Sequence, residues 1–366
     1  MYFDTNDLDK YVEGKKVSIM HGGDIYRNSI QHDFSVNINP MGMPAEVQWV
    51  LTEAVFHANK YPDIYHERLV EMTSGIFNIP ENHIVYGNGA SEIIMAICHS
   101  IAPKKVLLLA PCFSGYETCV KGACKDCDIS YYTLSEDNDF EIHHDILEHI
   151  QVVKADLMFL TNPNNPNGKL ISKTLLEEIV SACEKAGTVL VVDECFLALT
   201  GEERENSLAY DISEHKSLIV LRAYTKTFAI PGVRIGYCLC GSEAMATSLR
   251  NHLPEWNLSM FAQMAGVECL KHMEYIEDSA KLIEQERRYL TQGLSRLGAK
   301  VYTSDANYIL FKCSELDLNK KILEYSILIR ECSDYNGLEK GFYRVAVKSH
   351  GENEKLLSAL EDLLND

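Results

Sequence analysis

Short apolar segments alternate with longer amphipathic segments between residues 85 and 240 of the chain. Most of the short segments are apolar without alternation, which is typical of strands covered by helices on both faces. These strand-like segments lie at 105–110, 156–161, 188–193, 217–222 and 234–240. The pattern predicts an α/β fold with a mostly parallel sheet.

Helical patterns fill the intervals between these strands. We expect one helix after residue 89 and another from Ser172, a capping residue, to Gly187, a residue type that commonly follows a helix. Beyond residue 252 the pattern changes to amphipathic helices at about 255–298, strand-like segments and a last helix from Glu352. A chain of 366 residues exceeds the roughly 250–300 residues at which single cores stop growing, so we expect a large domain at 41–252 and a smaller one at 253–366.

The composition narrows the possible partners. The 53 acidic and 34 basic residues give a formal charge of −19, which provides no general attraction for nucleic acid or anionic membranes. The N-terminal segment is acidic where a signal peptide would be basic, and no run of about 18 apolar residues follows. We therefore expect a cytoplasmic protein that binds neither nucleic acid nor membrane.

The 12 cysteines are scattered, many of them inside apolar segments, as expected for reduced and buried thiols. Cys119, Cys124 and Cys127 resemble part of an iron–sulfur ligand set in their spacing. No fourth ligand stands in register with them, so no metal site is expected.

Polar residues stand at or just after the ends of three predicted strands. Asn165 follows the strand at 156–161, Asp193 closes the next, and Lys226 follows the strand at 217–222. Alone, each has an ordinary explanation as a turn amide, a helix cap or a solvated lysine, but ligands of open sheets bind beyond the carboxyl ends of the strands. Together they suit pyridoxal 5′-phosphate, which needs a lysine amine for a Schiff base, an aspartate for its ring nitrogen and a donor for its phenolic oxygen.

The segment YGNGASEII at 86–94 offers a site for the phosphate of such a cofactor. The amides of Gly89, Ala90 and Ser91 stand at the expected start of a helix, where they can point at an anion. The segment is also a partial dinucleotide fingerprint, but its last position is Glu92 rather than glycine. A nicotinamide-dependent dehydrogenase is therefore disfavoured.

These motifs together resemble the fold-type I pyridoxal-phosphate enzymes, in the branch that holds histidinol-phosphate aminotransferases and threonine-phosphate decarboxylases. GNGASE, TNPNNPNG, VVDECF and TKTFAIPGVRIGY occur in family order, and the resemblance covers nearly the whole chain. It implies the fold-type I architecture, with a large domain built on a mostly parallel mixed sheet and a smaller α+β C-terminal domain. It also implies an N-terminal arm at 1–40 that packs on the small domain and the active site, and a homodimer with shared active sites.

The resemblance implies catalytic roles for two residues. Lys226 is the expected Schiff-base lysine, and Asp193 is the expected partner of the ring nitrogen. The other residues implied around the cofactor are Gly89, Ala90, Ser91, Phe113, Asn165, Thr225, Arg234 and, reaching the neighbouring subunit's cofactor, Tyr61. Phe196 and Ala223 depart from the aminotransferase pattern, since a tyrosine and a phosphate-binding serine are common there.

Four stretches resemble the decarboxylases more than the aminotransferases: HGGDIY, DFSVNINPMGMP, FAIPG and the segment at 327–357. The resemblance implies that Arg344 holds the α-carboxylate of an amino-acid substrate and Arg330 its distal phosphate. The other substrate-binding residues that we expect are His21, Gly22, Asn39 and Asn165. Asp24 and Lys348 replace an expected asparagine and arginine, so the distal group can differ from that of threonine phosphate.

The sequence therefore predicts a pyridoxal-phosphate-dependent decarboxylase of an O-phospho amino acid. The favoured reaction converts L-threonine O-3-phosphate to (R)-1-amino-2-propanol O-2-phosphate and carbon dioxide for cobalamin (cobamide) biosynthesis. The alternatives are a histidinol-phosphate-type aminotransferase and a decarboxylase of serine phosphate or phosphonoalanine. A non-catalytic protein that binds pyridoxal phosphate is a further alternative.

Overall fold

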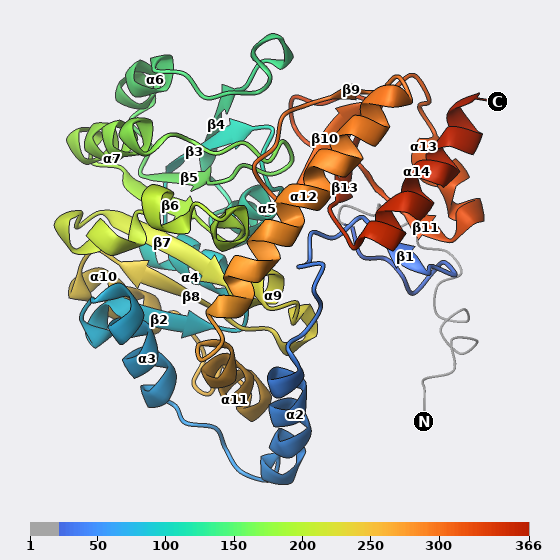
Figure 1. Ribbon diagram of the computed structural model, residues 1–366. Coiled ribbons are helices and arrows are strands. Elements are labelled where there is room, and N and C mark those ends of the chain that lie inside the picture. The colour runs from blue at the N-terminus through green and yellow to red at the C-terminus, as the bar shows by residue number, and fades with distance from the viewer. Residues whose placement is uncertain (1–21, 366) are drawn as a thin grey trace.

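A computed structural model of the protein describes residues 22–365 and contains a central sheet of seven strands (Figure 1). The strand order is β2-β8-β7-β6-β5-β3-β4, and only β8 runs antiparallel to its neighbours. The strands are β2 (Ile84–Gly87), β3 (Lys105–Ala110), β4 (Asp128–Thr133), β5 (Leu157–Thr161), β6 (Val189–Asp193), β7 (Leu218–Ala223) and β8 (Gly236–Cys240). The predicted α/β fold with a mostly parallel sheet is confirmed.

Helices cover both faces of this sheet (Figure 1). One hydrophobic core includes side chains of α4 (Ala90–Ile101), α5 (Gly115–Ala123) and α10 (Glu243–Arg250). The other core includes side chains of α3 (Glu67–Phe77), α6 (Asp145–Val153), α7 (Lys173–Ala186) and α11 (Met260–Cys269). The predicted caps of α7 are present, since the Ser172 side chain accepts a hydrogen bond from the Leu175 amide and Gly187 has a φ of 76°.

The C-terminal part carries a second, antiparallel sheet in the order β12-β13-β10-β9. Its strands are β9 (Lys300–Val301), β10 (Tyr308–Lys312), β12 (Arg330–Glu331) and β13 (Phe342–Ala346). The long helix α12 (Glu274–Arg296) runs between the two sheets (Figure 1). The helices α13 (Leu318–Lys321) and α14 (His350–Asn365) complete this region.

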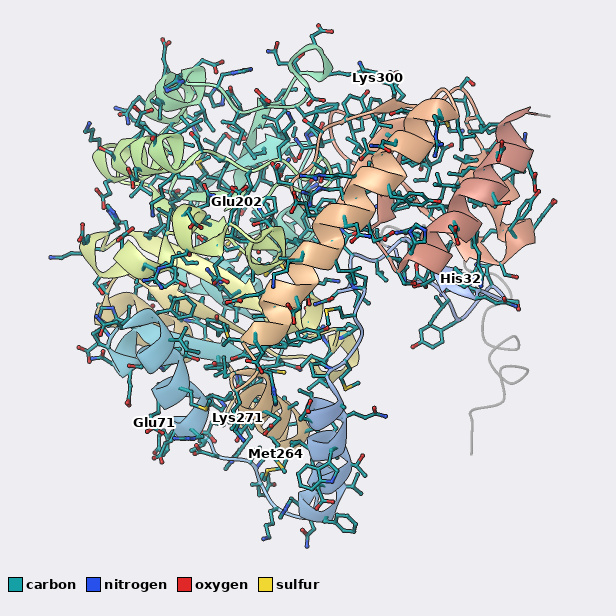
Figure 2. The ribbon with its side chains drawn as sticks, in the orientation of Figure 1. His32, Glu71, Glu202, Met264, Lys271 and Lys300 are labelled. Atoms are coloured by element: carbon teal, nitrogen blue, oxygen red, sulfur yellow. The ribbon has the colours of Figure 1, made fainter. Side chains whose placement is uncertain are left out.

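The chain segment before residue 40 is tied to the C-terminal region. Strand β1 (His32–Asp33) pairs in parallel with β11 (Ile327–Leu328), and Figure 2 shows His32 below α14. The His32 ring lies 3.1 Å from the amine of Lys355 on that helix. From β1 the chain passes the edge of the central sheet to α2 (Ala45–Ala54), which packs beside α11.

Short helical turns link these elements. They include α8 (Glu203–Asn206) and α9 (Tyr224–Thr227), together with the 3₁₀ turns at 55–57, 81–83, 136–138, 197–200, 209–214, 231–233 and 322–325. None of the helices within residues 22–365 is both long and apolar enough to cross a lipid bilayer.

Replacing Leu160 by alanine tests the assignment of β5 to the core. Leu160 is fully buried in the centre of the sheet, so Leu160→Ala should cost about 2–5 kcal/mol and lower the thermal midpoint clearly. Val152 on α6 is 74% exposed, and Val152→Ala is the matched control that should change the midpoint little. Equal losses in the two variants would contradict this packing. Differential scanning fluorimetry measures both.

Candidate active site

A cavity of about 320 Å³ opens beyond the carboxyl ends of β5, β6 and β7. Because these strands are parallel, their ends meet at one edge of the sheet. Strands β12 and β13 of the small sheet contribute Arg330 and Arg344 to the opposite wall, and the loop between them contributes Tyr335. The N-terminal segment contributes Gly22, Ser35 and Asn37. The cavity thus lies where three parts of the chain meet.

Lys226 enters this cavity from α9, the short turn that follows β7. Burial lowers the pKa of its amine to about 8, and the nearby charges of Arg344 and Arg234 act in the same direction. An amine with this pKa is partly neutral near physiological pH and therefore available as a nucleophile.

Asp193, the last residue of β6, is held by two hydrogen bonds. Its Oδ2 accepts from the Tyr116 hydroxyl at 2.6 Å, and its Oδ1 accepts from the Cys195 amide at 3.0 Å. Burial raises the pKa of this carboxyl group, while the hydrogen bonds oppose that shift. A cationic ring nitrogen placed beside Asp193 would favour the charged carboxylate further.

Sequence reasoning missed Tyr116 and Thr161, which form a buried network with Asp193. The Tyr116 hydroxyl lies 2.9 Å from Thr161 Oγ1, and Thr161 stands opposite Asp193 in the register of β5 and β6. The only local signal was the position of Tyr116, in the first turn of α5 and three residues after Phe113, which precedes the helix. Their ring centroids are 5.4 Å apart in an edge-to-face arrangement.

An anion cradle lies at the start of α4. Ala90, Ser91, Thr225 and Arg234 line this end of the cavity, and Gly89 precedes the helix with a φ of 79°. Any side chain at Gly89 would collide with the Arg234 guanidinium, so the arginine packs directly over the loop. Backbone amides at a helix N-terminus beside an arginine suit a phosphate group.

The Pro-Gly turn between Lys226 and Arg234 explains how both cations reach the same cavity. The 3₁₀ turn at 231–233 reverses the chain, and Arg234 adopts a left-handed backbone conformation with a φ of 62°. The Arg234 side chain also donates a hydrogen bond to the Pro231 carbonyl at 3.1 Å. The turn therefore sends Lys226 and Arg234 toward one ligand from two sides of a loop.

Phe113 and Phe196 both line the cavity. Phe196 packs edge-to-face on Tyr308, with ring centroids 5.1 Å apart. Phe196 lacks the hydroxyl of the tyrosine that is common at this position in aminotransferases, and its ring makes this aromatic contact. Ala223, the other departure from the aminotransferase pattern, lines the cavity as well.

Two arginines stand directly opposite each other on the paired strands β12 and β13. Arg330 is the register partner of Arg344, and both side chains are almost fully buried in the cavity wall. Residues opposite each other in an antiparallel pair point to the same face, and like charges there repel. An anionic ligand between them would offset that repulsion.

Arg344 is held by neutral groups. It donates to Asn165 Oδ1, to the Tyr335 hydroxyl at 3.2 Å and to the Ser35 carbonyl at 2.8 Å. Within residues 22–365 no carboxylate pairs with it, and its buried Nε has no hydrogen-bond partner there. Arg344 therefore keeps an uncompensated charge beside Lys226, which fits a ligand carboxylate.

The structure does not bring Asn39 to the cavity. Its side-chain amide donates to the Thr227 carbonyl at 2.8 Å and to Ser279 Oγ at 2.7 Å, so it fixes the loop that follows Lys226. Asn37 lines the cavity in its place, with a buried Oδ1 that has no partner among the described residues.

Other predicted residues lie at or beyond the edge of the site. Gly22 lines the cavity, whereas His21 lies outside the described residues. Tyr61 is 79% exposed and packs on Trp256 at 4.8 Å, away from the cavity of its own chain. The Asp24 carboxylate pairs with Arg27 at 2.7 Å and does not line the cavity.

Lys348, the second expected departure at the distal site, also lies away from the cavity. Its amine is 3.5 Å from Glu352 and 5.8 Å from the centre of the Phe34 ring. Neither Asp24 nor Lys348 therefore alters the charge of the cavity wall directly.

The fold and this lysine–aspartate pair beside a helix N-terminus define a fold-type I pyridoxal-phosphate enzyme. The sequence profile described as "Aminotransferase class I and II" matches residues 30–363, and the chain belongs to that family. The family depends on pyridoxal 5′-phosphate, and the cavity residues fit this cofactor.

Three similar proteins show how close two activities are. The threonine-phosphate decarboxylase of Salmonella typhimurium is 32% identical over 91% of both chains. The histidinol-phosphate aminotransferase of Caldanaerobacter subterraneus subsp. tengcongensis is 33% identical over 92% of this chain and 93% of its own. The crystal structure of the histidinol-phosphate aminotransferase from Clostridium acetobutylicum gives a TM-score of 0.84 at 31% identity, covering 91% of this chain and 99% of the other.

Removing the charge of Arg344 should raise the pKa of Lys226. In the cofactor-free protein we expect the amine to titrate at about 8, and Arg344→Gln should move it toward 10.5, because a neighbouring positive charge disfavours the protonated lysine. The measurement is the pH dependence of Lys226 acylation, followed by peptide mass spectrometry. Arg27→Gln, at a surface ion pair, is the control and should leave the titration unchanged. An unshifted pKa in Arg344→Gln would contradict the coupling.

Proposed function

We propose that this protein decarboxylates an O-phospho amino acid, with L-threonine O-3-phosphate as the favoured substrate. The observation that carries the proposal is the uncompensated, buried guanidinium of Arg344 beside Lys226. A substrate α-carboxylate would supply the missing negative charge. Arg330, directly opposite on β12, would then meet a second anion at the distal end of the same molecule.

The reaction depends on which bond at the α-carbon stands perpendicular to the cofactor plane. When bound, pyridoxal phosphate withdraws electrons from that bond. Arg344 is fixed by Asn165, Tyr335 and the Ser35 carbonyl, so it can hold the carboxylate in one orientation. Carbon dioxide leaves if that orientation is the perpendicular one, and Lys226, in its protonated ammonium form, can then deliver a proton to the α-carbon and become a neutral amine.

The phosphate and the ring of the cofactor would be held by different segments at the edge of the large sheet. Gly89, Ala90, Ser91, Thr225 and Arg234 form the cradle for the phosphate. Asp193 would face the ring nitrogen, Phe113 would stack on the ring, and Asn165 would donate to the phenolic oxygen. Tyr116 supports this arrangement through its hydrogen bond to Asp193.

The second candidate is a histidinol-phosphate-type aminotransferase. The nearly equal identities to a decarboxylase and an aminotransferase support it. The lyase is favoured by the four decarboxylase-like stretches, each of which supplies a cavity residue: Gly22, Asn37, Pro231 and Arg344. Production of aminopropanol phosphate would place the enzyme in cobalamin (cobamide) assembly in the cytoplasm.

A homodimer with shared active sites is also proposed, because aromatic side chains are exposed around α2 and the loop that follows it. Trp49, Phe56, Tyr61 and Tyr65 are each more than half exposed in the single chain. Of these, Trp49 lines a shallow cavity together with Met264 and Lys271, which Figure 2 labels at the end of the molecule where α2 and α11 lie together. Exposed aromatic clusters of this kind commonly mark protein interfaces.

Incubation of the holoenzyme with O-phospho-L-threonine should release carbon dioxide without any keto acid. L-Threonine, which lacks the charge that Arg330 would bind, should react with a kcat/KM about 10- to 100-fold lower. Borohydride reduction followed by mass spectrometry should place the cofactor adduct on Lys226. Incubation with histidinol phosphate and 2-oxoglutarate is the matching test of the aminotransferase. Formation of glutamate in that incubation would support the aminotransferase instead.

Mixed dimers test the shared active site. Lys226→Ala and Tyr61→Ala homodimers should each be strongly impaired. After refolding as a one-to-one mixture, about a quarter of wild-type activity should return, because half of the dimers are mixed and each of those has one intact site. No recovery, despite mixed dimers detected by native mass spectrometry, would place Tyr61 outside the partner's site.

A further inference from the structure

Arg330 already carries an internal counter-ion. Its Nη2 donates to both carboxylate oxygens of Asp334, at 2.8 and 2.6 Å, and its Nη1 donates to the Glu331 carbonyl at 2.6 Å. Arg330 is 6% exposed and lines the cavity, whereas the Asp334 side chain is 29% exposed. The Nη2 donors of Arg330 are therefore engaged by a carboxylate before any ligand binds.

The acidic group that bears on the distal site is thus not the one that the sequence suggested. Asp24 is paired with Arg27 and does not line the cavity. Asp334 contacts the arginine itself, and it is the one carboxylate that pairs with either Arg330 or Arg344 within residues 22–365. The two opposed arginines consequently differ, since the charge of Arg330 is offset by Asp334, whereas no carboxylate within residues 22–365 offsets that of Arg344.

An incoming distal anion must either displace the Asp334 carboxylate or share the guanidinium with it. Two anions on one buried cation repel each other, and the repulsion grows with the charge of the ligand. A phosphate monoester carries close to two negative charges at neutral pH, whereas a phosphate diester or a carboxylate carries one. The cost of Asp334 therefore falls most heavily on the fully ionised phosphate.

We propose that Asp334 is a specificity-determining residue that weakens the binding of dianionic distal groups more than that of singly charged ones. This inference rests on the proposed function, because it assumes that Arg330 meets the distal end of an amino-acid substrate. The opposing role, in which Asp334 only orients Arg330 for phosphate, predicts the reverse effect of removing the carboxylate.

The experiment compares wild-type holoenzyme with Asp334→Asn on O-phospho-L-threonine and on its methyl phosphodiester, which carries one distal charge. Asparagine keeps the size of the side chain and removes its charge. In Asp334→Asn the KM for phosphothreonine should fall about tenfold with kcat nearly unchanged, and the KM for the diester should change by less than about threefold. An unchanged or higher KM for phosphothreonine would overturn the inference.

Two variants guard this comparison. Glu331→Gln is the matched control, since it removes a carboxylate from the residue next to Arg330 on β12. The Glu331 carboxylate accepts hydrogen bonds from the Ser333 amide and hydroxyl and does not pair with Arg330. Glu331→Gln should leave both KM values unchanged. Asp334→Ser removes the same carboxylate and leaves a smaller side chain. It should show the same fall in the KM for phosphothreonine, and it replaces Asp334→Asn in the comparison if Asp334→Asn folds poorly.

Binding of 3-phosphonopropanoate separates this inference from the proposed function. This ligand has a carboxylate and a distal phosphonate but no amine, so isothermal titration calorimetry reads its affinity for the holoenzyme without any reaction. If 3-phosphonopropanoate binds Asp334→Asn more tightly than wild type, and neither protein decarboxylates an O-phospho amino acid, the role of Asp334 is supported and the proposed function is overturned. Decarboxylation by wild type, with equal affinities and equal KM values in the two proteins, would overturn the role of Asp334 alone.

Discussion

The register of β5, β6 and β7 is the constraint on which the site depends. Thr161 stands opposite Asp193, and Asp193 stands opposite Leu221. Lys226 follows Leu221 by five residues, on the short helix α9. These positions are fixed by strands buried on both faces, so a slip of one residue would turn every side chain to the other face. The aspartate and the lysine thus hold their separation because the core beneath them cannot shift.

A comparison of buried arginines separates charges that stabilise the fold from charges that await a ligand. Arg222, on β7, pairs with Glu194 at 2.6 Å and also with Glu203, so its charge is offset inside the protein. Arg344 is equally buried, yet its hydrogen-bond partners are neutral and no carboxylate among the described residues pairs with it. Burying such a charge is costly unless a ligand completes the pair, which makes Arg344 a candidate for ligand binding.

The sequence predicted what local pattern encodes, and it failed where distant segments meet. The apolar strands and the residues at their ends, Asp193 and Lys226, were readable because strand and ligand edge are adjacent in the chain. Strand β4 was missed because it lies at the sheet edge, where its residues are partly exposed and polar. The sequence predicted Asn39 and did not single out Asn37, because it gives no register for an arm that pairs with a strand nearly 300 residues away. Tyr335 and Asp334 gave no local signal, since their roles arise from contacts with β12 and β13.

The division of labour in the site explains why similarity alone leaves the reaction open. The residues proposed to hold the cofactor lie at the carboxyl ends of the strands of the large sheet or on the helices and loops beside them. The groups that would orient a substrate converge on Arg344 from three separate segments, through Asn165, Tyr335 and the Ser35 carbonyl. A change in any one of these segments can reorient the substrate carboxylate and leave the cofactor untouched. We therefore infer that the reaction type depends on a few contacts around Arg344. Overall sequence identities of 32% to a decarboxylase and 33% to an aminotransferase do not report on those contacts.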